Sequence, residues 1–161
     1  MSKWVNGALL LTAALAGGCA SVEATQEERQ AREAAKKESI QDILSQPLAN
    51  EDYSEEERCL STYSYRSVDV LDDQHVLFKG TGGRLWLNTL RQRCVGLRAQ
   101  DTLSFELRDN RLCDMDRFES VDTFAYMTRT SATCTLGKFS PVTAEQVQAI
   151  EAAVKESRQR N

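Results

Sequence analysis

The sequence predicts a mainly β fold of the α+β class: a small antiparallel β-sheet or partly open barrel, stapled by two disulfides and followed by a C-terminal amphipathic helix. Three observations support this prediction. Between Tyr53 and Val142 apolar residues recur with a period of two, which is typical of half-buried strands. Four cysteines fall within the same span. After Pro141 the apolar period changes to that of a helix.

Turn-forming residues divide this core into strands. Segments 72–74 (Asp-Asp-Gln) and 80–83 (Gly-Thr-Gly-Gly) have the composition of hairpin turns, and 109–110 (Asp-Asn) is a further candidate. The apolar phase slips near 66–67, which indicates a β-bulge. Alternation over 103–107 predicts a strand that faces the core through Leu103, Phe105 and Leu107. The expected strands are 63–70, 75–79, 84–90, 102–108 and 121–128.

The C-terminal helix is predicted from its cap and its apolar face. Thr143 and Gln146 stand three residues apart, which is the spacing of a capping box. Val147, Ile150 and Val154 then share one helical face, which would pack on the sheet. Arg158 and Arg160 near the end suit the helix dipole, and we expect both to be solvated.

The cysteines indicate an oxidising compartment. Of five cysteines, Cys19 stands apart and four lie in the core, an even number that predicts two disulfides in an exported chain. Three pairings are possible. We expect Cys94 to pair with Cys113, since each follows one of two successive strands, and Cys59 to pair with Cys134, joining the start of the core to its end. No C-x-x-C spacing is present, so no metal site is expected.

The N-terminus has the form of a signal peptide. Lys3 precedes a mostly apolar run over 5–15, too short for a membrane-spanning helix, and small residues at 16–18 lead into Cys19. This segment resembles the lipobox of bacterial lipoproteins, which implies cleavage before Cys19 and acylation of its thiol and new amino group. The alternative is an ordinary secretory signal with an incidental cysteine. Ala20 stands where an aspartate often directs retention in the inner membrane, so we expect the periplasmic face of the outer membrane.

Three regions follow from these assignments. Residues 1–18 form the signal peptide, 19–52 the lipidated cysteine with a charged linker, and 53–161 the disulfide-stapled domain with its helix. In the linker, oppositely charged residues four apart favour a helix, and the linker is interpreted as a helical spacer or as a disordered tether.

The charge balance excludes one class of partner. The chain has a formal net charge of −4, with 20 basic and 24 acidic residues. Binding of nucleic acid needs a basic surface, so it is not expected, and no cofactor motif is found. The partners expected are the membrane, through the lipid on Cys19, and an unidentified envelope protein.

Four features invite a functional interpretation, and for each the structural one is favoured. His75, the single histidine, follows Asp72 and Asp73 and could act as an oriented base, but no G-x-S-x-G segment accompanies it, so a strand-end role is expected. The glycine-rich segment 80–83 is not followed by the Lys-Ser/Thr pair of a phosphate-binding loop, so a plain turn is expected there. The acidic residues at 114, 116 and 119 lack a calcium-binding loop and are expected to be solvated. Trp86 could anchor a partner, but burial is favoured.

Several segments together resemble a family of uncharacterised Gram-negative bacterial lipoproteins. They are Cys59, V-L-D-D-Q-H-V-L-F at 70–78, G-G at 82–83, L-N-T-L at 87–90, Cys94 with G-L at 96–97, L-C at 112–113, and C-T-L-G-K-F-S-P-V at 134–142. Thr135 replaces the glycine expected after the last cysteine. The resemblance implies export, a lipid anchor and a cysteine-stapled domain, and it supplies no catalytic residue.

The sequence therefore predicts a membrane-anchored periplasmic lipoprotein that binds a protein or acts as an accessory envelope module, and not an enzyme. The alternative is a cell-envelope hydrolase that uses His75 with nearby carboxylates.

Overall fold

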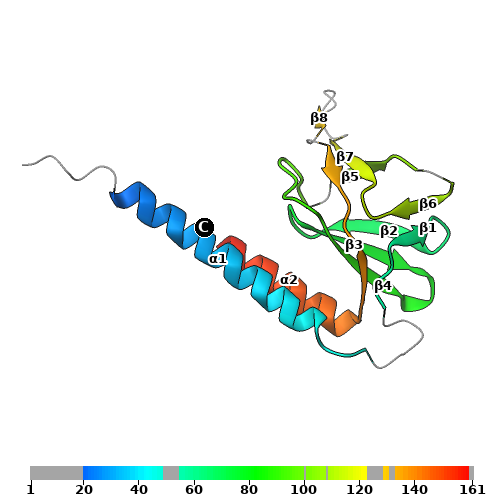
Figure 1. Cartoon of the computed structure of the whole chain (residues 1–161), viewed down its shortest axis with the longest axis horizontal. Helices are drawn as coiled ribbons and strands as arrows, with labels where there is room; N and C mark the ends of the chain where they lie inside the picture. Colours follow the sequence, from blue (N-terminus) through cyan, green and yellow to red (C-terminus); the bar gives the residue numbers. More distant parts are fainter. Residues whose placement is uncertain are drawn as a thin grey trace, which may run out of the picture. The chain divides into compact units, whose positions relative to one another are not determined.

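The computed structural model describes residues 20–48, 55–99, 101–107, 109–122, 129–130 and 133–159 (Figure 1). The chain divides into two compact units, 1–35 and 36–161. Helix α1 (Ala20–Leu44) crosses the boundary between them, and the second unit begins at Lys36. Within the first unit, Arg32 pairs with Glu28 one helical turn earlier, at 3.3 Å. None of the helices that the structure describes is long and apolar enough to cross a membrane.

The second unit contains three small antiparallel sheets, and the described strands form no closed barrel. Sheet A has the order β10-β4-β3-β2, sheet B pairs β1 with β6, and sheet C has the order β5-β7-β8, with β9 also on β7. The strands are β1 (Cys59–Ser61), β2 (Tyr65–Val70), β3 (His75–Gly80), β4 (Leu85–Thr89), β5 (Thr102–Phe105), β6 (Arg111–Cys113), β7 (Arg117–Asp122), β8 (Arg129–Thr130), β9 (Cys134–Thr135) and β10 (Phe139–Val142). The mainly β fold with a C-terminal helix, α2 (Ala144–Gln159), is confirmed.

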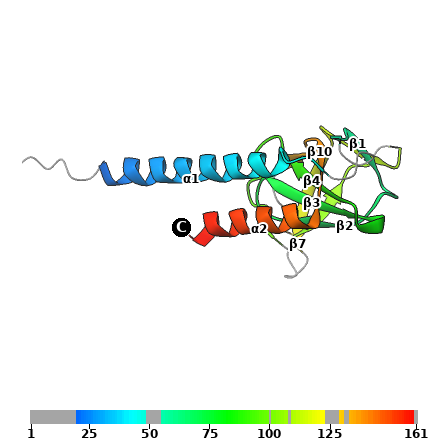
Figure 2. The ribbon, with the colours of Figure 1, turned by 90° about the horizontal axis from the view of Figure 1, so that it is seen from below.

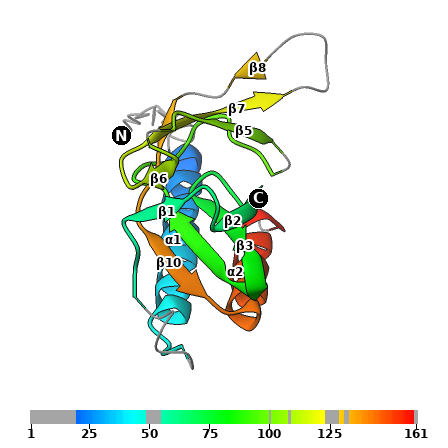
Figure 3. The ribbon, with the colours of Figure 1, turned by 90° about the vertical axis from the view of Figure 1, so that its right-hand side faces the viewer.

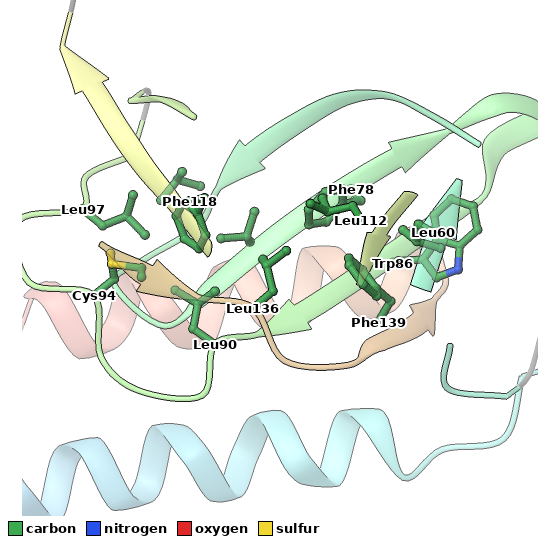
Figure 4. Packing of buried hydrophobic residues seen from close by; sticks show 13 residues of the cluster. Leu60, Phe78, Trp86, Leu90, Cys94, Leu97, Leu112, Phe118, Leu136 and Phe139 are labelled. Atoms are coloured by element: carbon green, nitrogen blue, oxygen red, sulfur yellow. A yellow bond between two sulfur atoms is a disulfide. The ribbon is translucent and has the colours of Figure 1, made fainter. Parts of the chain in front are cut away.

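Sheet A is buried on both faces. Successive residues of β3 point to opposite faces, so that Val76 and Phe78 enter one apolar cluster while Leu77 enters another. The first cluster lies between sheet A and sheets B and C, where the rings of Phe78 and Phe139 meet edge to face at 5.1 Å between centroids (Figure 4). Trp86 belongs to this cluster, and its expected burial is confirmed.

The second cluster joins the other face of sheet A to the helices. Ile40 from the C-terminal part of α1 and three residues of α2, Val147, Ile150 and Val154, pack on Leu77 and Leu87. Figure 3 shows α2 and the C-terminal end of α1 on the same side of sheet A, and Figure 2 shows α2 leaving the end of β10. The predicted apolar face of the C-terminal helix is therefore confirmed.

The capping box is also confirmed. The Thr143 hydroxyl oxygen accepts a hydrogen bond from the Gln146 backbone N–H at 3.1 Å, and the Gln146 side-chain oxygen accepts one from the Thr143 N–H at 2.9 Å. The side-chain NH₂ group of Gln146 donates a hydrogen bond to the Ile43 carbonyl at 2.9 Å. The cap of α2 thereby also satisfies a carbonyl in the last turn of α1.

Two disulfides are present, but the expected pairing is wrong. Cys59 is bonded to Cys113, and Cys94 to Cys134. The first bond follows from the pairing of β1 with β6, which sets Cys59 directly opposite Cys113. The second follows from the loop after β4, where Arg91 N–H donates to the Thr135 carbonyl and holds this loop against β9.

The local turn and bulge predictions can now be compared with the structure. The register of β2 and β3 shifts between Tyr65 and Ser67, which confirms the bulge. The hairpin turn between them and the turn at 109–110 are confirmed, the latter with positive φ at both residues. The glycine-rich segment forms a short 3₁₀ turn, Thr81–Gly83, between β3 and β4. The inward position expected for Leu107 is wrong, since β5 ends at Phe105 and Leu107 is 52% exposed.

The expected strand at 121–128 overlaps β7 at its first two residues, and 123–128 lie outside the described residues.

Gly137 lies where a side chain has no room. The buried Asn88 amide clamps it, because Asn88 Nδ2 donates to the Gly137 carbonyl at 2.8 Å and Asn88 Oδ1 accepts from the Gly137 N–H at 2.9 Å. A Cβ atom added to Gly137 would overlap the backbone carbonyl of Thr89. The clamp holds β10 to β4 at the end of sheet A.

Gly137→Ala should lower the free energy of unfolding by about 3 kcal/mol, the upper end of the overpacking range, because the overlapping atom belongs to the backbone. Urea unfolding followed by circular dichroism measures the effect. Thr89→Ala, which removes an exposed side chain and keeps the carbonyl, is the control and should change stability by no more than about 0.5 kcal/mol. Equal stabilities of the two variants would contradict the close approach.

Candidate functional site

The site is centred on the turn between β2 and β3. Asp72 stands in this turn, and its Oδ1 atom accepts hydrogen bonds from the backbone N–H groups of Gln74 at 2.8 Å and His75 at 2.7 Å. A short acidic side chain that bonds the backbone two and three residues on is a common way to stabilise a turn. The same Oδ1 atom lies 2.8 Å from His75 Nδ1. The turn therefore positions both side chains before any long-range contact is made.

Lys36 completes a buried cluster with these two residues. Its Nζ atom lies 3.0 Å from Asp72 Oδ2, and the three side chains of the cluster are only 5–6% exposed. Lys36 comes from α1, 36 positions before Asp72. Asp73, the other carboxylate considered beside the histidine, takes no part, since its Oδ2 pairs with Arg93 Nε at 3.1 Å.

The hydrogen bonds fix the ionisation of Asp72. Burial on its own raises the pKa of this carboxyl, but the hydrogen bond and the charge interaction with His75, the backbone N–H of Gln74 and the charge of Lys36 outweigh it. The pKa of Asp72 therefore lies well below its ordinary value of 3.8. Because an ionised carboxylate can only accept, His75 Nδ1 must carry the hydrogen between them. Nε2 is then the ring nitrogen left for a further hydrogen bond.

His75 also lines a cavity of about 450 Å³. The C-terminal part of α1 forms one wall, and the ends of β3, β4 and β10 form the other. The lining residues are Lys37, Ile40, Gln41, Leu44, Ser45, Glu56, His75, Thr89, Lys138 and Ser140. The strand-end position expected for His75 is confirmed, because it is the first residue of β3, and the cavity at this position was not expected.

Nε2 is the second ring nitrogen of His75, a residue that lines this cavity. None of the described residues forms a hydrogen bond with Nε2, while every fully buried side-chain nitrogen or oxygen in the described part of the chain has a partner. Nε2 is therefore accessible to solvent, although the residue as a whole is only 5% exposed.

Glu56, Lys138 and Ser140 form a second polar group on the cavity wall. Lys138 Nζ and Ser140 Oγ each donate to a different oxygen of Glu56, both at 3.0 Å. The hydrogen bond from Lys138 lowers the pKa of Glu56, against a smaller opposite effect of burial. The hydroxyl of Ser140 is therefore directed to a carboxylate and not to the imidazole.

The acidic loop after β6 differs from the expectation. Asp114 was expected to be solvated, but its side chain is 7% exposed and pairs with Arg58 at 3.5 Å and Arg91 at 3.4 Å. Asp116 Oδ2 accepts from the Cys113 N–H at 2.6 Å. Within the described residues no three His, Cys, Asp or Glu side chains gather as metal ligands would.

Sequence reasoning missed Lys36 and Glu56. Arg158 is exposed, as expected, and its guanidinium also donates to the Leu71 carbonyl at 2.6 Å, next to the Asp72 turn. Lys36 and Lys37 are adjacent members of one charged segment, and only the fold buries the first and exposes the second. No local pattern distinguishes them.

Comparison with known proteins gives one match. A family model described as a family of unknown function (DUF6491) matches residues 2–160. No curated protein and no solved structure matches the chain.

Proposed function

Because the chain belongs to this family of unknown function (DUF6491), we propose a role from its own residues: a lipid-anchored protein of the cell envelope that binds a partner protein and is not an enzyme. The observation that carries the proposal is the use of the cysteines. Four of the five form two disulfides, and the fifth, Cys19, directly follows the signal-like segment.

The disulfides support export. Structural disulfides form and persist in oxidising compartments such as the bacterial periplasm and are rare in the cytosol. An exported chain needs a signal, and residues 3–18 have the basic start, apolar run and small-residue end of one. Acyl chains on Cys19 would hold the protein at the membrane stably, because several chains bind far more strongly than one.

The surroundings of His75 support binding over catalysis. A nucleophilic serine needs a base within hydrogen-bond reach of its hydroxyl. Ser140, which lines the same cavity, donates to Glu56 instead. Asp72 does orient the imidazole, but it also neutralises the buried Lys36, so the cluster has a structural role in holding α1 to sheet A.

The anchor is tested by Cys19→Ser in the native host. We expect the variant to lose labelling by a palmitate analogue, to escape cleavage at this position and to leave the outer-membrane fraction. Ala20→Asp is the matched variant: it should keep the label and move to the inner-membrane fraction. If Cys19→Ser is still labelled and cut at the same place, the anchor proposal is wrong.

The second candidate is a hydrolase, which is favoured by the presence of His75 and Ser140 on one cavity wall. A fluorophosphonate probe separates the two candidates, because it labels serines that a base activates. Our proposal expects no labelling of the folded protein. Labelling that Ser140→Ala or His75→Gln abolishes would establish the hydrolase instead.

A further inference from the structure

We propose that the cavity beside His75 binds a compact hydroxylated monoanion of the sugar-acid class. The inference depends on neither the lipid anchor nor a protein partner, and it rests on three properties of the cavity: an oriented imidazole, a local positive charge, and a size and lining that suit one sugar ring.

The oriented group is the imidazole of His75. Asp72 holds Nδ1–H at 2.8 Å, and the turn hydrogen bonds hold Asp72, so the ring has a fixed direction. A ring nitrogen without a protein partner, on a residue that lines a cavity, is suited to a hydroxyl group of a ligand, because a hydroxyl group can both donate and accept. Sites built to bond a hydroxyl group discriminate strongly against analogues that lack it, because the buried polar group is then left unpaired.

The charge of the cavity is opposite to that of the protein. Two ammonium groups, Lys37 and Lys138, line it against one carboxylate, Glu56, whereas the whole chain carries a formal charge of −4. Lys138 is paired with Glu56 at 3.0 Å. Lys37 forms no ion pair with any residue in the part of the chain that the structure describes. One uncompensated positive charge matches a monoanionic carboxylate better than a dianionic phosphate monoester.

The size and the lining of the cavity suit a single sugar ring. Its volume of about 450 Å³ lies within the range of small-molecule sites, about 300 to 1,000 Å³. Ile40 and Leu44 supply apolar side chains to the lining, and Thr89 and Ser140 supply hydroxyl groups. An apolar surface with a few convergent polar groups is the usual composition of such sites.

The experiment uses the single histidine as its reporter. In the full-length protein in detergent, labelled with ¹⁵N-histidine, one imidazole gives all the signals. Glucuronate is the probe, with glucose lacking the charge and cyclohexanecarboxylate lacking the hydroxyl groups. We expect saturable shifts of the Nε2 and Cε1–H signals with glucuronate, and binding at least several-fold weaker with each of the other two.

Charge variants complete the test. Lys37→Gln should weaken glucuronate binding about twofold to fivefold, the range for an exposed ammonium–carboxylate contact, and leave glucose unaffected. Lys155→Gln, the same change at an exposed position of α2 outside the cavity, should leave both unchanged. The proposal is overturned if glucuronate causes no saturable shift, if the three probes bind equally, or if Lys37→Gln has no effect on glucuronate.

Discussion

Asp72→Ala should lower the free energy of unfolding by about 3 to 5 kcal/mol, because it removes the partner of a buried charge. Lys36 is left without its carboxylate, and His75 Nδ1–H loses its acceptor, while both side chains stay out of water. The loss is a large part of the stability of a typical domain, about 5 to 15 kcal/mol. Urea unfolding at pH 7, followed by circular dichroism, measures it.

The control is the exposed ion pair on the same hairpin. Asp69 and Lys79 are 45% and 46% exposed, and such pairs contribute about 0 to 1 kcal/mol, so Asp69→Ala should have a small effect. If the two alanine variants lose equal stability, the buried cluster does not hold the fold as described. Lys36→Met in the Asp72→Ala background should recover stability, since it removes the unpaired buried charge.

The pH dependence has a defined sign. Because the pKa of Asp72 is lowered in the folded state, its contribution is complete above its unfolded-state value, near 3.8, and is lost as the pH falls through the folded-state value. Unfolding between pH 5 and pH 2 should therefore show a steeper loss of stability in the wild type than in Asp72→Ala. Parallel curves would contradict the lowered pKa.

Removing the buried disulfide in Cys94→Ala/Cys134→Ala should cost about 4 kcal/mol by the chain-entropy argument. The two cysteines are 40 positions apart, and both are 1% exposed, so the bond restricts a long segment of the unfolded chain. A less restricted unfolded state exposes more surface, so the slope of stability against urea should also rise.

Cys59→Ala/Cys113→Ala provides a comparison of similar size, since those positions are 54 apart. Non-reducing peptide mapping of the wild type should recover the Cys59–Cys113 and Cys94–Cys134 peptides. Recovery of Cys94–Cys113 as the main species would contradict the structure.

Much of the local structure could be predicted, because it depends on contacts between residues that are close together in the sequence. The bulge at Tyr65–Ser67, the turn at Asp72 and the cap at Thr143 are all decided by contacts within a few residues or within one hairpin. A period-two pattern likewise follows from the geometry of one strand. Such features are present in the local sequence before the chain folds.

The disulfide pairing could not be predicted for the opposite reason. It depends on β1 lying beside β6, a contact between strands about 50 positions apart that no local pattern encodes. We expected Cys94 and Cys113 to meet because they follow successive strands, but β4 and β5 belong to different sheets. Strand order therefore decides the pairing.

The candidate site was predicted in part. Asp72 and His75 are close in sequence, so their association was visible as a possible oriented base. Lys36 and Glu56 reach the site from segments before the first strand. Glu56 is one of nine glutamates between positions 19 and 58, and Lys36 is one of two adjacent lysines, so neither stands out in the sequence. The cavity exists because the C-terminal part of α1 packs on sheet A. Residues 19–52 were interpreted as a linker, and that interpretation predicted no packing on the sheet.

The order of attachments along the chain has a mechanical consequence. A pulling force applied between the N-terminus and sheet A acts first on the noncovalent contacts that hold α1 to the sheet. These are the Lys36–Asp72 pair and the apolar contacts of Ile40. The force meets its first covalent stop at Cys59, which is tied to β6. Residues 20–58 can therefore be drawn out, to about 130 Å at 3.3 to 3.6 Å per residue, while Cys59–Cys113 and Cys94–Cys134 keep the strands between them from extending. Such a chain would lengthen under tension without unravelling its sheets.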